Sequence, residues 1–309
     1  YDGTPVTAHA TKGVVIATGG YAANLQMVVD TNVYWSSDYL STSTKTTNRS
    51  SLQGDGITMA QAAGADVTGM GFTQMMPISW IDNGNLAFGG GNYAIYINPT
   101  TGKRFVDETS ERDVLSLAEF RNGIEHNGTK GVFIELANAS SKIPGPYLYG
   151  NEDVEWRQYV RTVDQLAELF ASLGLETDAD TVRATIENYD KAVMAGEQPE
   201  GVKKTNPNAL IGYAEKDENG NYLPETYKLD GVEMRVRFMA PSTHHTMGGI
   251  KVDTERHALD AEDNVIPGLY AAGEVTGGIH GGNRLGGNAI VEIFVSGRTA
   301  AEAIQADNK

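Results

Sequence analysis

Two short apolar runs, one near each end of the chain, stop at loops that contain glycine. The first is KGVVIATGG at 12–20, and the second is VIPGLYAAGE at 265–274. Continuous β-branched and aliphatic runs of this length are typical of strands buried in a parallel sheet, and a glycine pair after such a strand is typical of a loop that faces a ligand. For 12–20 the alternative is an ordinary strand followed by a turn.

Helical spacing dominates the middle of the chain. A short alanine-rich helix is predicted within 53–67, and two amphipathic helices are predicted within 161–174 and 177–193. The last of these carries apolar residues at the spacing expected for core contacts: Val182, Ile186, Tyr189 and Val193. By contrast, residues 36–51 are rich in Ser and Thr without any periodicity, which predicts an exposed loop.

Turn and cap signals set further boundaries. Pro99 and Gly102 join two β-like runs between 93 and 108, which indicates a hairpin. Ser110 and Asp113 match a capping-box pattern at the start of the helix that follows. Near the end of the chain, Asn288 would cap a terminal helix, which would direct N–H groups and a partial positive charge at a ligand.

The pattern of apolar strands followed by glycine loops ends near residue 74 and begins again after residue 246. This interruption predicts two domains. An α/β domain would be built from 1–74 and 244–309, whose strands share one sheet, and an α+β domain would be inserted at 75–243. Ligands of such sheets bind at the carboxyl ends of the strands, so both glycine loops are expected to face one ligand. The chain has neither a GxGxxG nor a Walker A sequence, so its glycines alone do not indicate a phosphate site.

Composition narrows the function classes. The 309 residues, 40% of them hydrophobic, are enough for two cores. A formal net charge of −16 disfavours nucleic acids and anionic membrane surfaces as partners, so an anionic ligand would need local cations. The absence of cysteine excludes disulfides, thiolate nucleophiles and iron–sulfur ligands from this chain. No apolar run is long enough to span a bilayer, and the start at Tyr1 rather than Met suggests a processed or excised chain.

Five motifs, distributed over nearly the whole chain, carry a resemblance to a known family. They are ATGGYAAN (17–24), GDGITMAQAAGA (54–65), TGKRFVDETSERD (101–113), HHTMGGIKVDT (244–254) and VIPGLYAAGEVTGGIHGGNRLGGNAI (265–290). The chain resembles the flavoprotein of the fumarate reductase and succinate dehydrogenase family, in particular its soluble flavocytochrome c and urocanate reductase branch. The resemblance implies a partial, Rossmann-like α/β FAD-binding domain with an inserted α+β clamp, or capping, domain. The family's opening segment, whose GxGxxG loop holds the FAD adenosine, has no counterpart in this chain.

The resemblance implies a catalytic set of three residues. Arg284 and His244 resemble the pair that binds a substrate carboxylate in the family. A planar guanidinium offers parallel N–H donors to both carboxylate oxygens, and an imidazole beside it adds another donor. A structural ion pair is the alternative. Arg112 resembles the proton donor that protonates the substrate carbon while flavin N5 delivers a hydride to its neighbour, although a solvated arginine would also fit this position. His245 is expected to support the substrate pocket rather than to react.

The same resemblance implies a non-covalently bound FAD. The residues expected to face it are Gly19, Gly20, Glu274, Gly287, Asn288, Ala289 and Ile290. The start of the terminal helix would stabilise the anionic reduced flavin. No metal is expected except a monovalent cation, for which the backbone carbonyls of Thr246, Met247 and Gly248 are candidates.

Two departures from the fumarate reductases bear on the substrate. Met76 stands where those enzymes have a histidine, and Leu86 stands where they have a threonine; in the family these two side chains hold the second carboxylate of fumarate. A thioether and an isobutyl group cannot make those hydrogen bonds. The expected substrate is therefore an acrylate- or cinnamate-like enoate, with Trp80, Phe88 and Tyr93 either lining an apolar distal side or belonging to the core.

The residues that return a proton to the catalytic arginine in the family have no counterpart either. Ala87 and Gly90 stand in place of the relay glutamate and arginine. We therefore expect Arg112 to be reprotonated by another route, from water or from Glu111.

The resulting hypothesis is an FAD-dependent reductase of the activated C=C bond of an α,β-unsaturated carboxylate, supplied by an electron-donor module or protein outside this chain. Two alternatives stay open: a dehydrogenase similar to the ketosteroid dehydrogenases of the same superfamily, and a non-catalytic fragment that needs its N-terminal half. The retained Arg112 and the carboxylate pair disfavour the dehydrogenase. Because relatives are often exported for respiration, we expect an exported bacterial protein, periplasmic or at the cell surface.

Overall fold

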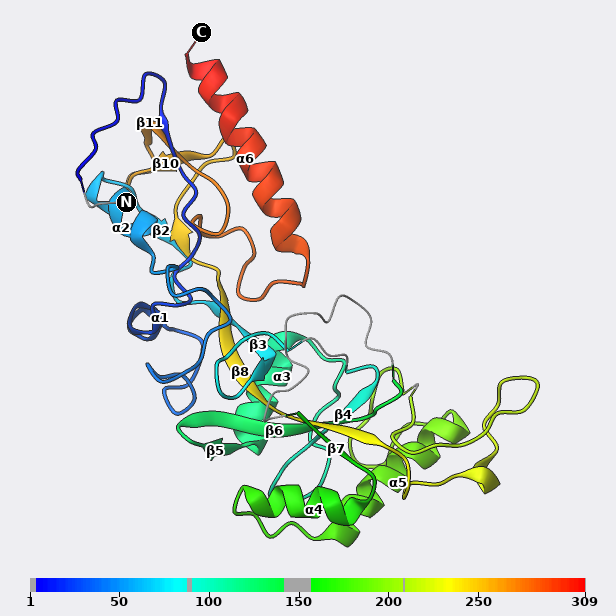
Figure 1. Ribbon diagram of the computed structural model, residues 1–309. Helices are drawn as coiled ribbons and strands as arrows, with labels where there is room; N and C mark the ends of the chain where they lie inside the picture. Colours follow the sequence, from blue (N-terminus) through cyan, green and yellow to red (C-terminus); the bar gives the residue numbers. More distant parts are fainter. Residues whose placement is uncertain (1–3, 88–90, 142–156, 208, 309) are drawn as a thin grey trace. The chain divides into compact units, whose positions relative to one another are not determined.

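The computed structural model describes residues 4–87, 91–141, 157–207 and 209–308 (Figure 1). The chain forms two compact units. The first comprises Tyr1–Thr42, Asn48–Gln74 and His244–Lys309, and the second comprises Ser43–Thr47 and Met75–Thr243. The five-residue piece belongs to the second unit because Thr243 N donates to Lys45 O at 2.8 Å and Thr47 N donates to Thr243 O at 2.9 Å.

The first unit contains a three-stranded sheet in the order β1 (Val14–Ile16), β11 (Val265–Ala271), β10 (His257–Leu259). β1 and β11 are parallel, which confirms that sequence-distant pieces share one sheet, and β10 is antiparallel to β11. The predicted burial of the first strand is only partly right, because Val14 is 51% and Val15 is 40% exposed while Ile16 is buried. Among the described strands β1 lies at the edge of its sheet, where fewer neighbours cover the side chains.

The described part of the first unit also contains three helices and a short antiparallel ladder. The helices are α1 (Leu25–Thr31), α2 (Asp55–Ala62) and α6 (Asn288–Asp307), and the ladder joins β2 (Val67–Thr68) to β9 (Gly249–Ile250). α2 is the predicted alanine-rich helix. It needs glycine at position 56, because a Cβ there would lie 2.0 Å from Thr18 Oγ1.

The start of α6 differs from the prediction. The N-cap is Gly287 at φ 90°, with no side-chain cap hydrogen bond, and Asn288 is the first residue of the helix. Glycine takes this left-handed conformation without strain, so the chain turns one residue before the asparagine could act as a cap.

The second unit is built on a six-stranded sheet. The central order is β3 (Thr73–Trp80), β8 (Met234–Thr246), β6 (Thr129–Asn138), β4 (Ala94–Ile97), with β5 (Ile124–His126) paired to β6 and β7 (Arg157–Val160) paired to β8. β6 is antiparallel to β4, β5 and β8. Because successive side chains of a strand point to opposite sides, the sheet has two different faces.

One face of this sheet is apolar and packs against α4 (Val163–Ser172) and α5 (Ala179–Ala195). Val132, Ile134 and Leu136 of β6 share a core with side chains of both helices. The two helices match the predicted amphipathic pair, and the predicted core residues are buried: Val182, Ile186, Tyr189 and Val193. Burial of this apolar stripe is therefore what fixes α4 and α5 on the sheet.

The opposite face packs against α3 (Arg112–Asn122). Phe133 and Ala137 of β6 share a second core with Leu115 of α3. α3 begins at Arg112, but its N-cap is Glu111 without a side-chain cap hydrogen bond, so the predicted capping box of Ser110 and Asp113 is wrong. The physical reason is that Ser110 N closes a turn onto Asp107 O before the helix starts.

The predicted hairpin is also only partly right. Gly102 N donates to Asn98 O at 2.9 Å, as expected for the turn, but Arg104 reaches Ile97 through a single bridge and no second strand forms. The described chain also has a short 3₁₀ turn at Pro224–Thr226 and no helix or strand within 36–51. Of the helices in the described ranges, none combines the length and the apolar character needed to cross a membrane.

Candidate functional site

Arg284 is a buried cation in the first unit. It is 6% exposed, its Nη1 donates to Leu285 O at 3.3 Å, and its Nε has no hydrogen-bond partner among the described residues. Burial lowers the pKa of Arg284, and the negative charge of Glu274 opposes this shift. A guanidinium nevertheless stays protonated in proteins. A buried charge with an unpaired N–H is a strong candidate to bind an anion.

The loop that carries Arg284 is fixed by a side chain from β3. Gln74 Nε2 donates to Arg284 O and to Asn283 Oδ1, both at 2.6 Å. Gly281 and Gly287, on either side, have φ of 64° and 90°. These left-handed positions explain the glycines that flank the arginine, because the backbone turns before and after it.

Two histidines accompany this arginine. The rings of His245 and His280 are 5.4 Å apart, and His245 Nδ1 and His280 Nε2 are buried without a partner among the described residues. Burial, and then the charge of Arg284, lowers the pKa of His245 to about 3. Burial also lowers the pKa of His280, with Arg284 acting in the same direction and Glu292 opposing it. Both rings are therefore neutral at pH 7, and each leaves one nitrogen for a ligand.

Glu274 joins the end of β8 to the first glycine loop. Its Oε1 accepts from Thr246 N at 3.0 Å and from Thr246 Oγ1 at 3.3 Å, while its Oε2 lies 3.6 Å from His245 Nε2. Tyr21 N donates to the same Thr246 Oγ1. A Cβ on Gly20 would lie 2.1 Å from Thr246 Oγ1 and 2.5 Å from Glu274 Oε1. Gly20 is thus required by contacts within the protein, and the expected roles of Gly20 and Glu274 towards FAD stay predictions.

Gly19 precedes this contact at φ 80°, and a Cβ on it would lie 3.1 Å from a methyl group of Leu52. Burial raises the pKa of Glu274. Its carboxylate is nevertheless held by the donors of Thr246, which favour the charged form. The loop after β1 and the end of β8 are therefore one tightly packed structure.

The three residues predicted to be catalytic belong to different units. His244 is half-buried in the first unit, and its backbone O accepts from Asn48 Nδ2 at 2.9 Å. Arg284 belongs to the same unit, whereas Arg112 is half-buried at the start of α3 in the second. Their roles towards a substrate stay predictions.

The start of α6 fits a flat, partly anionic aromatic group such as a flavin. A Cβ on Gly287 would meet nothing within 4 Å, so the backbone there is open to a ligand. The 20-residue helix directs its partial positive end and its first-turn N–H groups to this place. Leu285 and Ile290 beside it are 75% and 59% exposed and would cover an aromatic ring. With them, Asn288 and Ala289 are the residues that would hold the FAD implied by the resemblance.

The residues predicted to line the distal side of the substrate pocket lie in the second unit. Met76 is 3% exposed, and Leu86 is half-buried and bridged to Ser79. The thioether of Met76 would offer a ligand in contact with it no hydrogen-bond donor. Contact of either side chain with a substrate stays a prediction.

The other residues of the segment 76–93 lie partly in a core and partly at the surface of the second unit. Trp80 and Ala87 belong to the core beside α3, which supports the core interpretation of Trp80. Tyr93 lines a groove of about 360 Å³ together with Tyr222 and other residues of the second unit. Phe88 and Gly90 lie outside the described residues.

The predicted monovalent cation stays a prediction. Met247 O accepts from Gly278 N at 3.2 Å, and Met247 N donates to Phe72 O at 2.9 Å. Gly248 is packed so closely that a Cβ would lie 2.2 Å from Met70 Cα. These contacts hold the backbone of the loop rigid.

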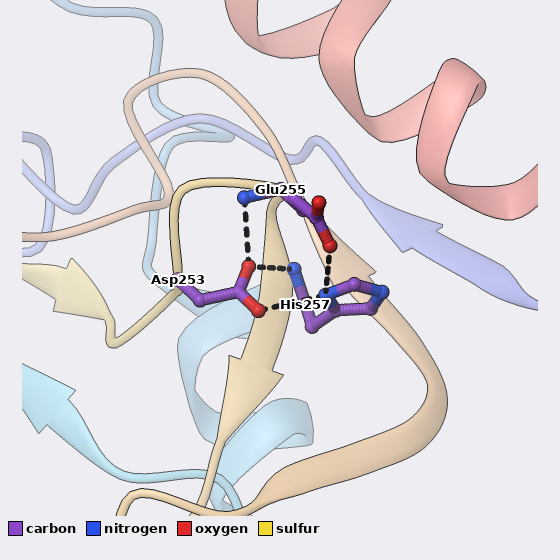
Figure 2. Close-up of side chains that lie close together, drawn as sticks. All are labelled: Asp253, Glu255 and His257. Carbon is purple, nitrogen blue, oxygen red and sulfur yellow. Dashed lines mark hydrogen bonds and ion pairs between the residues drawn. The ribbon is translucent and has the colours of Figure 1, made fainter. Parts of the chain in front are cut away.

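A second cluster, not expected from the sequence, brings Asp253, Glu255 and His257 together (Figure 2). Although their ligand atoms lie within 4.8 Å of one another, both ring nitrogens of His257 are already engaged, Nδ1 with Asp253 Oδ2 at 2.8 Å and Nε2 with Asp307 Oδ2 at 2.9 Å. Burial opposes protonation, but the hydrogen bonds to Asp307 and Asp253 outweigh it and raise the pKa of His257. Because neither ring nitrogen is left for a metal, this cluster fastens the end of α6 to the sheet.

No role was predicted for His280, although it is the first residue of the HGGNR motif. Its place in the same motif as Arg284 was the available signal. The contact of its ring with that of His245, 35 positions earlier in the chain, could not be predicted from any local pattern.

Comparisons with known proteins agree with this geometry. Residues 1–290 match a family model described as an FAD binding domain. The chain is 38% identical over 309 residues to the NADH:acrylate oxidoreductase of Vibrio harveyi, covering 98% of this chain and 28% of that protein. It is 33% identical over 297 residues to the fumarate reductase (cytochrome) of Shewanella frigidimarina, covering 94% of this chain and 44% of that protein. The chain thus spans less than half the length of these relatives.

Solved structures show the same fold. The open conformation of a flavocytochrome c3 fumarate reductase matches with a TM-score of 0.67 and 27% identity, covering 96% of this chain and 46% of that one. A 3-ketosteroid Δ1-dehydrogenase from Sterolibacterium denitrificans matches with a TM-score of 0.70 but 20% identity, covering 99% of this chain and 55% of that one. At that identity the second match shows the fold alone.

Proposed function

Because the chain belongs to the family of FAD binding domains, we propose that it forms the substrate-binding part of an FAD-dependent oxidoreductase that reduces the activated C=C bond of an α,β-unsaturated carboxylate. The resemblance to fumarate reductase flavoproteins and the α/β FAD-binding fold are confirmed by the relatives and the flavocytochrome structure. The observation that carries the proposed activity is Arg284, a buried guanidinium with an unpaired Nε beside two neutral histidines. This set of donors suits a carboxylate.

The proposed substrate has one carboxylate. Arg284 and His244 would hold it, and the apolar, buried Met76 supports a substrate without a second carboxylate, because that group would be left without donors. The name of one relative, NADH:acrylate oxidoreductase, agrees with such a substrate, and the name of the other, a fumarate reductase, defines the competing one.

Reduction adds a hydride to the carbon β to the carboxylate and a proton to the α carbon. FAD, when bound, supplies the hydride. Arg284 orients the enoate by its carboxylate and withdraws charge from the double bond, and Arg112 gives its proton to the α carbon. Arginine is a weak acid, so it serves only a strongly basic acceptor such as a nascent carbanion. The electrons come from a donor module or protein outside this chain, and an exported location belongs to the same proposal.

A substrate screen on the full-length protein tests this. With reduced viologen as donor, we expect acrylate and cinnamate to be reduced, fumarate to be reduced more slowly, and a 3-ketosteroid not to be dehydrogenated with an oxidised dye. Reaction with fumarate or a steroid alone would contradict the proposal. A full-length protein that holds FAD and reacts with none of these compounds would favour a non-catalytic binding role.

A further inference from the structure

The α3-facing side of the sheet in the second unit contains a buried polar layer. Strand alternation sends Val132, Ile134 and Leu136 of β6 to the main core. Glu135 faces α3 together with Phe133 and Ala137. Arg235 and Arg237 of β8 pair with Glu135 on that side. Tyr96 of β4 stands opposite Glu135 in register. The side chains of Glu135, Tyr96 and the two arginines are all at least nine-tenths buried.

α3 adds two polar side chains to this layer. Ser116 and Glu119 are both 0% exposed, and neither Ser116 Oγ nor the two carboxyl oxygens of Glu119 have a hydrogen-bond partner among the described residues. Glu119 lies close enough to Tyr96 for its charge to contribute to the raised pKa of that tyrosine. Burial raises the pKa of Glu119 well above its usual value, which favours the protonated carboxylic acid.

A buried carboxyl group without a hydrogen-bond partner is unusual in a core. Leaving such a group unpaired is destabilising, and an apolar residue at position 119 would avoid that cost. Ser116 and Glu119 are three positions apart on α3 and therefore neighbours on its surface. Their three unpartnered oxygens could serve a buried water, which needs two to four polar partners. Glu119 therefore has the properties of a proton store rather than of a structural side chain.

The helix connects this store to Arg112. Positions 112, 116 and 119 are separated by four and three residues, so they follow one another along one face of α3. That face runs from the half-buried Arg112 at the helix start to the fully buried Glu119. Glu111, in contrast, is exposed and precedes the helix.

We propose that Glu119, acting through the Ser116 hydroxyl and a buried water, returns the proton that Arg112 loses in each turnover. This inference rests on the proposed function. After Arg112 has protonated the substrate carbon, its neutral guanidine takes a proton from the water, the water takes one from Ser116 Oγ, and Ser116 takes the proton of Glu119. Glu119 is left as a carboxylate, opposite the restored charge of Arg112. After product release, a proton taken up from bulk solvent enters at Arg112 and passes back along the same groups to Glu119, which restores its carboxylic acid.

The first test does not depend on turnover. The infrared difference spectrum between the full-length wild type and Glu119→Gln, both at pH 7, should contain the C=O band of a protonated carboxyl that only the wild type has. Glu125→Gln, which removes an exposed carboxylate in the same unit, is the matched control and should not change this band. Absence of the band in the folded wild type would overturn the proposal.

The second test follows enoate reduction by the FAD-loaded, full-length protein. Glu119→Gln should lower kcat on the order of 100-fold, leave KM and the flavin spectrum unchanged, and make the rate fall more steeply as the pH rises. Ser116→Ala should act in the same way, and Ser116→Thr, which keeps the hydroxyl, should restore the rate. These two variants keep the test decisive if Glu119→Gln folds poorly.

The outcomes separate the two proposals. A kcat of Glu119→Gln and Ser116→Ala equal to that of the wild type, or a loss confined to Glu111→Gln, would overturn the relay and leave the reductase intact. A flavin-loaded wild type that reduces no enoate would overturn the proposed function and, with it, the relay.

Discussion

Gly20→Ala tests the packing between the first glycine loop and the end of β8. The new Cβ would lie 2.1 Å from Thr246 Oγ1 and 2.5 Å from Glu274 Oε1, and neither atom belongs to a flexible chain end, because each is hydrogen-bonded. Overpacking of this kind costs about 1–3 kcal/mol. Displacing Thr246 Oγ1 also breaks its bonds to Glu274 and to Tyr21, which adds about 1 kcal/mol for each bond. We therefore expect a loss of about 3–5 kcal/mol in the free energy of unfolding.

The assay is urea unfolding of the chain without added flavin, with amide hydrogen exchange used to assign the transition to the first unit. At a slope of about 3 kcal/mol per molar urea, the midpoint should fall by about 1 M or more. The matched control is Gly297→Ala in α6, where a Cβ would meet nothing within 4 Å; it should stabilise the helix by up to about 1 kcal/mol. A Gly20→Ala midpoint equal to that of the wild type would show that Thr246 and Glu274 give way freely, and the packing argument would be wrong.

Three further predictions concern single side chains. Arg284→Met in the full-length protein should raise KM for an acrylate by about 30-fold or more, since a charge partner worth at least about 2 kcal/mol is lost; an unchanged KM would remove Arg284 from the carboxylate site. The pKa of His257 is raised in the folded protein, so its contribution to stability is fully present below the unfolded pKa of about 6.5 and is lost as the pH rises through the folded value. Unfolding midpoints between pH 6 and 9 should therefore fall for the wild type, and His257→Gln should remove this part of the slope. Asp190→Ala should destabilise the second unit by about 3 kcal/mol or more, because the carboxylate accepts from Ile211 N and Gly212 N at 2.8 and 2.7 Å and both donors would stay buried and unpaired; a thermal melt of the variant that matches the wild type would contradict this.

Periodicity and motifs in the sequence were enough to predict the helices of the second unit and the shared sheet of the first. α4 and α5 agree with the prediction because their apolar stripes are local and regular. The parallel pairing of β1 with β11 also agrees, because the apolar run that predicts each strand is local to its own segment. The exposure of Val14 and Val15 could not be predicted, since it depends on which elements cover the strand.

The wrong cap assignments have a common cause. Ser110 and Asn288 are suitable capping residues by type. The backbone before each helix has a different conformation from the one that a cap needs. Ser110 closes a turn onto Asp107, and Gly287 before Asn288 is left-handed. Residue type gives the propensity to cap and says nothing about the direction from which the chain arrives.

Only those site residues that belong to a sequence motif could be predicted. Arg284 could be found because it stands between glycine pairs, and its burial agrees with a binding role. The pairing of His245 with His280 and the burial of Glu119 beside Tyr96 join residues far apart in the chain. A glutamate on the apolar face of the helix predicted after Ser110 was the one local signal for Glu119.

The apolar start of α6 affects how this chain behaves in solution. Ile290, Val291, Phe294 and Val295 form an exposed stripe over two turns, with Phe294 74% exposed, and such a stripe is a site for self-association. The net charge of −16 opposes that association through long-range repulsion. At 0.1 M, salt screens the repulsion between charges more than about 10 Å apart, but it leaves the apolar attraction in place. The chain should therefore be monodisperse in dilute buffer and form larger species as salt is added, so purification at low ionic strength suits it best.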